Sequence, residues 1–305
     1  MEENVSFYSG PGYKLAATFY LPDNYRKGTK VPGILIAGGY RSQKDMFGAD
    51  TARKFAKYGY GVLNVEFRGF GQSEGPRYRH IAMEQLEDLI NGVTYLTTRS
   101  EVDSDRIGVW GTSFGGAHAV MLGASDPRVR VVVDAIGFAD GEPNLHSTRP
   151  EWEWLDFLKA IDEDRKTRVL TGKSRLVSPT DILMFDPGSL AASNERAKKF
   201  PELAEMKFPL SETAMAIMNY KPVEHVHKIS PRALLIIGAE NDFLCPIWHS
   251  KVLYEKAGPP KKLVIFNNAV HYDVVSKLLD RSIEISHEWF QLHMPPRPKE
   301  ATFSA

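Results

Sequence analysis

The chain contains a serine, an aspartate and a histidine that could act together as nucleophile, acid and base. They follow one another in the order Ser113, Asp242 and His271. Ser113 lies in the run Gly-Thr-Ser-Phe-Gly at 111–115. Such a Gly-x-Ser-x-Gly turn between a buried strand and a helix exposes the serine hydroxyl above the sheet, and N–H groups at the helix start can bind an oxyanion. Five loosely specified positions recur by chance, but here an apolar run precedes them and small residues follow. We therefore predict that Ser113 is a nucleophile.

Asp242 and His271 follow two further apolar runs and supply the charge and the base that an activated serine needs. Asp242 comes directly after the run 233–238, in a loop where its carboxylate could orient an imidazole. Glu240 in the same loop is the alternative acid. His271 lies between the last expected strand and the last expected helix, from where its ring could reach Ser113. We predict these three residues as a catalytic triad.

Stabilising an oxyanion requires a second N–H group besides that of Phe114, and the pattern places it in the loop after an expected strand at 31–37. The candidates are Gly39 and Tyr40, and the Tyr40 hydroxyl itself is a further option. The alternative interpretation is that the glycine pair at 38–39 only ends the strand.

Other polar motifs indicate neither a cofactor nor a metal. His225 and His227 are two residues apart, but no acidic or cysteine partner accompanies them at usable ligand spacing. The glycine-rich loop 68–75 lacks both a dinucleotide-binding register and a P-loop lysine, so it is interpreted as structural. We assign five histidines to a helix surface, the cap edge or the C-terminal helix: His118, His225, His227, His287 and His293.

The composition excludes several classes of partner. The chain has 305 residues, 43% of them hydrophobic, which is enough for one domain with an inserted cap. Its 38 basic and 38 acidic residues cancel, so no net field favours nucleic acid or an anionic membrane. Cys245 is the one cysteine, the first four residues do not resemble a signal peptide, and no apolar run reaches membrane-spanning length. We expect a cytoplasmic protein that binds an apolar or aromatic small molecule; self-association stays open.

Buried-strand patterns alternate with helical patterns over most of the chain, which favours parallel pairing with right-handed crossovers. Besides the strand before Ser113, strands are expected at 5–9, 14–21, 31–37, 61–66, 129–135, 233–238 and 262–266. Helices are expected at 44–58, 80–97, 247–256 and 272–292, besides the helix after Ser113.

The alternation is lost between 137 and 227, where helices are expected at 151–166, 190–200 and 211–219. We interpret this region as an insertion over the sheet edge. The predicted division is therefore a core at 1–136 and 228–294, a mainly helical cap at 137–227 and a flexible tail at 295–305.

Large apolar side chains in the cap could line a substrate pocket, although the same composition suits internal packing. They are Trp152, Trp154, Phe185, Phe208, Met215 and Met218.

The run at 111–115 resembles the nucleophile elbow of the α/β-hydrolase superfamily. The loop 68–73 and the stretches 242–246 and 270–273 look like its dienelactone-hydrolase and Xaa-Pro-dipeptidyl-peptidase-like (S15) branch. The resemblance covers about 31–290, apart from the cap. It implies an α/β-hydrolase fold with a mostly parallel eight-stranded sheet and helices on both faces, together with the triad and oxyanion hole named above.

These features predict a serine hydrolase that cleaves an ester, lactone or amide through an acyl-enzyme on Ser113. Two alternatives use the same triad: a hydrolase of carbon–carbon bonds and a thioesterase. A third is a ligand-binding protein that keeps the fold without catalysis, which the presence of all three triad residue types disfavours.

Overall fold

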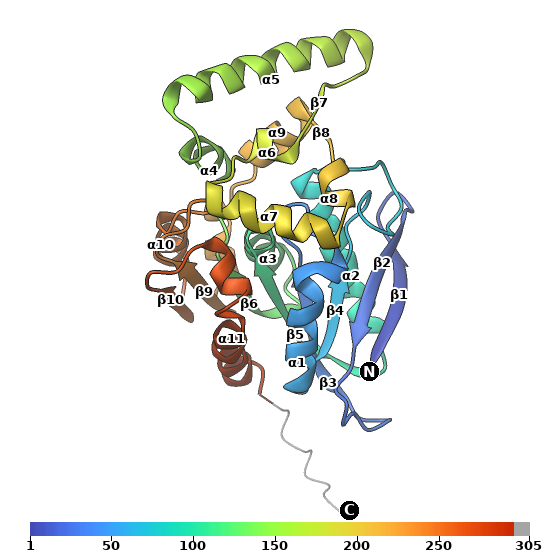
Figure 1. Cartoon of the computed structure of the whole chain (residues 1–305). Helices are drawn as coiled ribbons and strands as arrows, with labels where there is room; N and C mark the ends of the chain where they lie inside the picture. Colours follow the sequence, from blue (N-terminus) through green and yellow to red (C-terminus); the bar gives the residue numbers. More distant parts are fainter. Residues whose placement is uncertain (296–305) are drawn as a thin grey trace, which may run out of the picture.

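The computed structural model describes residues 1–295, apart from the side chain of Phe47. From 296 onward, the segment predicted as a flexible tail lies outside the described residues. Figure 1 shows a twisted central sheet with helices on both faces and a further group of helices stacked over one end. No helix within the described residues has the length and apolar character needed to cross a membrane.

The central sheet has eight strands in the order β1-β2-β4-β3-β5-β6-β9-β10. β1 and β2 form an antiparallel hairpin and β2 pairs antiparallel with β4, while all later neighbours pair parallel. The prediction of a mostly parallel eight-stranded sheet is therefore confirmed. The strands are β1 (Glu2–Tyr8), β2 (Lys14–Tyr20), β3 (Val31–Ala37), β4 (Gly61–Val65), β5 (Val102–Thr112), β6 (Val129–Ala135), β9 (Ala233–Ala239) and β10 (Lys261–Phe266).

Two apolar layers cover the sheet, because its central strands are buried on both faces. The first layer lies under α2 (Ala82–Thr98), α3 (Phe114–Ser125) and α10 (Trp248–Lys256). The second lies under α1 (Ala49–Lys57) and α11 (Leu279–His293). Short η elements complete the core: η1 (Lys44–Gly48), η2 (Pro222–Glu224), η3 (Val226–Ile229) and η4 (His271–Val275).

Two expected helices are each divided in the structure. The helix expected at 44–58 begins as the π-helix η1 and kinks at Met46, whose φ and ψ are not helical. The helix expected at 272–292 is split into η4 and α11, because Ser276 between them departs from helical geometry. In both cases the apolar residues keep a helical spacing across the point where the helix is interrupted, so the spacing alone does not predict the interruption.

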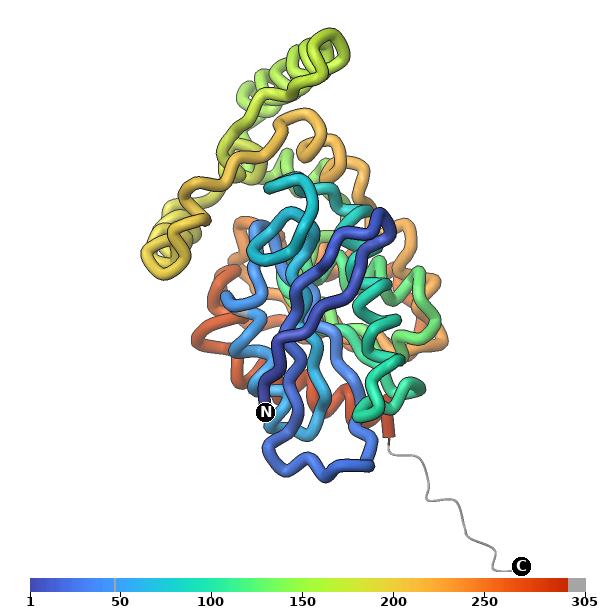
Figure 2. Tube along the Cα trace, turned by 90° about the vertical axis from the view of Figure 1, so that its right-hand side faces the viewer, coloured from blue at the N-terminus to red at the C-terminus, as the bar shows by residue number. Residues whose placement is uncertain are grey.

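Between β6 and η2 the chain forms a mainly helical region, as expected. Its elements are α4 (Gly141–Ser147), α5 (Glu151–Thr171), β7 (Leu176–Val177), α6 (Pro179–Ile182), α7 (Pro187–Lys199), α8 (Glu202–Glu205), β8 (Phe208–Pro209) and α9 (Leu210–Met218). Figures 1 and 2 both show α5 at the outer end of the molecule, away from the sheet. The division of the chain at 136 and 228 stays a prediction.

Candidate active site

Ser113 occupies a strained turn between β5 and α3. Its φ is +57° and its ψ is −125°, a conformation that non-glycine residues seldom adopt outside functional sites. The flanking glycines allow this turn. A Cβ atom on Gly115 would lie 2.0 Å from the Ala37 carbonyl oxygen, and one on Gly111 would lie 1.8 Å from the carbonyl oxygen of Gly115. The fold therefore requires glycine on both sides of Ser113.

A continuous line of hydrogen bonds joins Ser113, His271 and Asp242. His271 Nδ1 lies 2.7 Å from Asp242 Oδ2, and His271 Nε2 lies 3.0 Å from Ser113 Oγ. Because a carboxylate only accepts, Nδ1 carries the proton and Nε2 is left to accept from the serine hydroxyl. The side chain of Asp242 is fully buried, and its Oδ1 accepts from the Cys245 N–H at 2.9 Å. This arrangement can draw the proton from the hydroxyl of Ser113.

The alternative acid, Glu240, points elsewhere. It is exposed, and its carboxylate accepts from the Asn268 N–H at 2.8 Å. Asp242 follows β9 by three residues, and His271 begins η4, so their loops meet beside Ser113. The structure thus brings together the three residues that the sequence put forward.

The loop after β3 runs alongside Ser113. A Cβ atom on Gly39 would lie 3.4 Å from Ser113 Cβ and 3.1 Å from the Thr112 carbonyl oxygen. Phe114, the other predicted donor, is the first residue of α3. The Tyr40 hydroxyl donates to the Pro179 carbonyl oxygen at 3.0 Å, which leaves its backbone N–H rather than its side chain as the candidate oxyanion donor.

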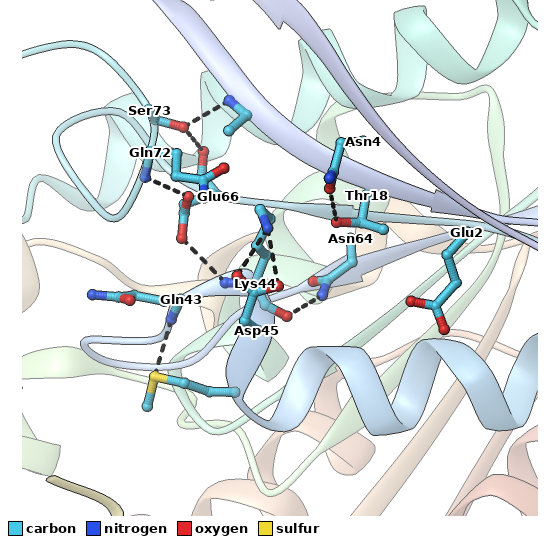
Figure 3. Close-up of polar contacts among 12 residues, drawn as sticks. Glu2, Asn4, Thr18, Gln43, Lys44, Asp45, Asn64, Glu66, Gln72 and Ser73 are labelled. Carbon is cyan, nitrogen blue, oxygen red and sulfur yellow. Dashed lines mark hydrogen bonds and ion pairs between the residues drawn. The ribbon is translucent and has the colours of Figure 1, made fainter. Parts of the chain in front are cut away.

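Buried polar contacts anchor the far end of this loop (Figure 3). The Lys44 N–H donates to Glu66 Oε1 at 3.4 Å, and Asn64 Nδ2 donates to the Lys44 carbonyl oxygen at 2.6 Å. Glu66 also accepts from the Gln72 N–H at 2.6 Å, which ties in the glycine-rich loop at 68–75. Burial raises the pKa of the Glu66 carboxyl above its usual value. These contacts hold the chain at Lys44, where the loop ends and η1 begins.

Ser113 opens into two cavities. The larger, of about 620 Å³ and partly open to solvent, also contains His271. The smaller, of about 270 Å³, is lined mainly by apolar side chains, and His271 is not among its lining residues. Leu183 from the helical region lines both cavities. Ser113 therefore lies where the two cavities meet.

One of the side chains expected to bind substrate, Phe185, lines the larger cavity. Trp152 is 66% exposed on α5, and Trp154 stacks on His146 with ring centroids 4.8 Å apart. Neither tryptophan is among the residues that line the two cavities, so their role in binding substrate stays a prediction.

The remaining expected cap side chains also pack internally. Phe208 is fully buried and stacks on His80, with ring centroids 5.5 Å apart. Met215 and Met218 pack against the apolar layer of α2 and α3. None of these three is among the residues that line the two cavities, so their role in binding substrate also stays a prediction.

The sequence interpretation missed a buried polar chain behind Phe114. Gln85 Oε1 lies 3.1 Å from His118 Nε2, and His118 Nδ1 lies 2.8 Å from the Tyr220 hydroxyl. His80 Nδ1 accepts from Gln85 Nε2 at 3.1 Å, and burial lowers the pKa of His80 to about 3. His118 is fully buried, so its assignment to a helix surface is wrong. The uniformly apolar surroundings of His118 in α3 were the signal for burial.

This fold, with a strained serine at the start of a helix and an aligned histidine and aspartate, defines an α/β-hydrolase of the serine hydrolase type. The model of the X-Pro dipeptidyl-peptidase (S15 family) matches residues 11–273. The chain belongs to that family.

Relatives extend over most of the chain. It is 30% identical over 282 residues to an Escherichia coli protein described as "Uncharacterized 31.7 kDa protein in traX-finO intergenic region", covering 92% of this chain and 96% of the relative. It is 24% identical over 286 residues to "Thiohydrolase aneE" of Aspergillus aculeatus, covering 89% and 86%. Among solved structures, the α/β hydrolase GrgF from Penicillium sp. sh18 superposes with a TM-score of 0.79 at 23% identity, covering 96% and 99%.

Proposed function

We propose that this enzyme hydrolyses carboxylic esters or thioesters of small molecules through an acyl-enzyme on Ser113, with His271 as base and Asp242 as its orienting carboxylate. One observation carries the assignment: the 2.7 Å and 3.0 Å contacts that link the three side chains end at a strained serine facing a cavity. Family membership supports the same reaction class.

The reaction follows from this geometry. His271 Nε2 takes the hydroxyl proton as Ser113 Oγ attacks the substrate carbonyl, and the buried Asp242 carboxylate stabilises the imidazolium that forms. Backbone N–H groups of Phe114 and of Gly39 or Tyr40 stabilise the oxyanion. His271 then gives the proton to the departing alcohol or thiol. A water molecule, deprotonated by the same ring, releases the acid and regenerates Ser113.

Thioesters and oxygen esters share each of these steps and differ only in the leaving atom. The likeness to a protein named as a thiohydrolase favours testing thioesters alongside esters. No step requires a metal or an organic cofactor.

The test compares wild-type enzyme with Ser113→Ala on 4-nitrophenyl acetate and on an N-acetylcysteamine thioester. We expect the substitution to lower kcat by about 10⁴-fold or more. Ser125→Ala, at the exposed far end of the same helix, is the matched control and should keep wild-type rates. Undiminished turnover by Ser113→Ala would rule out the acyl-enzyme route.

A further inference from the structure

A buried guanidinium lines the larger cavity, in the same loop as the candidate oxyanion donors. Arg41 is only 9% exposed and contributes to the cavity wall together with Ser113 and His271. Its φ is +61°, the left-handed region that non-glycine residues rarely occupy. The surrounding structure therefore holds a charged side chain at the cavity in an unfavourable backbone conformation.

The described residues leave the charge of Arg41 unneutralised. Its Nη2 donates to Ser193 Oγ at 2.9 Å, and its Cζ lies 5.1 Å from the ring centroid of Phe185. Its Nε is buried and has no hydrogen-bond partner among residues 1–295. None of the ion pairs in that part of the chain includes Arg41. Burying a guanidinium this way costs stability unless an anion joins it.

Two other buried arginines show how this chain satisfies such groups where no ligand is involved. Arg68 donates to both Asp88 and Glu87. Arg149 donates to three backbone carbonyl oxygens and to a threonine hydroxyl. Arg41 has neither arrangement, which sets it apart as a group with a donor to spare.

A second guanidinium strengthens the positive potential of the cavity. Arg196 from α7 also lines it, half-buried, with its Cζ 5.3 Å from the ring centroid of Tyr272. Burial and, to a lesser degree, the nearby charge of Arg41 lower the pKa of Arg196. Two positive charges near each other in a partly buried site repel, and a bound anion would relieve that repulsion.

The position of His271 assigns this cavity to one side of the substrate. The ring that donates a proton to the leaving group must lie next to that group. His271 lines the larger cavity and not the smaller one. The leaving alcohol or thiol therefore occupies the larger cavity with Arg41, and the acyl chain occupies the smaller apolar cavity.

We propose that the substrate's leaving group carries a carboxylate that binds Arg41. This inference assumes the acyl-enzyme route proposed above. A carboxylate matches both the planar donor fork of a guanidinium and its single charge. The substrate expected from the sequence is apolar or aromatic. On this proposal its acyl group is apolar and its leaving group carries an anion.

The test uses two acetate esters that differ only in charge: 4-acetoxybenzoate and its neutral methyl ester. The readout is the ratio of their kcat/KM values, measured for wild-type enzyme and Arg41→Gln. We expect wild-type enzyme to favour the anionic ester, and Arg41→Gln to lower the ratio by roughly 10- to 100-fold, as for loss of a charge-assisted hydrogen bond. Arg53→Gln, on the exposed part of α1, is the control and should keep the wild-type ratio.

A second variant tests the same site if Arg41→Gln does not fold. Ser193→Ala keeps the guanidinium but removes its hydroxyl acceptor, so we expect a smaller fall in the same ratio, roughly 3- to 10-fold. An unchanged ratio in the variants that fold overturns the carboxylate site. A wild-type preference for 4-acetoxyphenyl phosphate over 4-acetoxybenzoate overturns the choice of a carboxylate. The proposed function fails separately, if Ser113→Ala still hydrolyses the methyl ester.

Discussion

The two parts of the molecule that meet at Ser113 are held by different kinds of contact. On the sheet side, backbone geometry sets the site: the strained Ser113, glycines packed against backbone oxygens, and strand ends that place Asp242 and His271. On the helical side, single side chains bridge to the sheet, such as the Tyr40 hydroxyl on the Pro179 carbonyl and Arg41 on Ser193. We therefore propose that the sheet side determines the reaction and that the helical region selects the substrate.

The sharpest way to test the sheet side is to change the carboxylate and keep its shape. Asp242→Asn should lower kcat by about 10³- to 10⁴-fold, because the amide cannot stabilise an imidazolium and favours the wrong tautomer of His271. Steady-state kinetics on 4-nitrophenyl acetate give this value. Glu240→Gln, which alters the neighbouring exposed carboxylate, is the matched control and should stay within about twofold of wild type.

One glycine-to-alanine substitution in the sheet part and one in the helical region compare how well the two parts tolerate an added side chain. Gly115→Ala would force a Cβ atom to within 2.0 Å of the Ala37 carbonyl oxygen, so we expect a loss of more than about 3 kcal/mol in the free energy of unfolding. Gly172 caps the C-terminus of α5 at φ +74° and has open space around it. Gly172→Ala should therefore lower the free energy of unfolding by only about 1 kcal/mol. Urea denaturation measures both. Equal losses would contradict the contrast between the two parts.

A buried acid beneath the serine turn makes the stability of the sheet side depend on pH. Asp134 on β6 is fully buried, its Oδ1 accepts from the Gly137 N–H, and its Oδ2 has no partner among the described residues. Burial raises its pKa to about 7. The folded protein therefore keeps the proton between about pH 4 and pH 7 while the unfolded chain releases it, so this group's contribution to the free energy of unfolding falls as pH rises through that window.

Asp134→Asn mimics the protonated acid and should remove this pH dependence. We expect the difference in unfolding free energy between pH 5 and pH 8 to shrink by roughly 2–3 kcal/mol relative to wild type. Thermal unfolding of wild type and variant at pH 5 and at pH 8 measures this difference. A wild-type pH dependence in the variant would show that Asp134 does not hold a proton in the folded protein.

The sheet could be predicted because its signals are local. Continuous apolar runs such as 31–37 and 233–238 suit strands buried on both faces. The Gly-x-Ser-x-Gly run, with an apolar run before it and small residues after it, suits a tight strand-to-helix turn. Ser113, Asp242 and His271 then follow the carboxyl ends of β5, β9 and β10. These positions depend on backbone constraints that require particular residue types, such as the glycines beside Ser113, and so can be recognised in the sequence.

The contents of the cavity could not be predicted, because they depend on how separate segments meet. Phe185 lines the cavity and Trp152 lies exposed, yet both are large aromatic residues in one helical region. Arg41 looks like any surface arginine until Ser193, 152 positions later, is folded against it. His118 likewise reveals its burial only through the layer packed around α3.

Fluorophosphonate labelling followed by peptide mass spectrometry tests the central claim most directly, because such probes bond to an activated serine. We predict a single adduct on the peptide containing Ser113 in wild-type enzyme, with none in Ser113→Ala and much slower labelling in Asp242→Asn. An adduct on a different serine, or ester turnover by an enzyme whose Ser113 stays unmodified at saturating probe, would contradict the account.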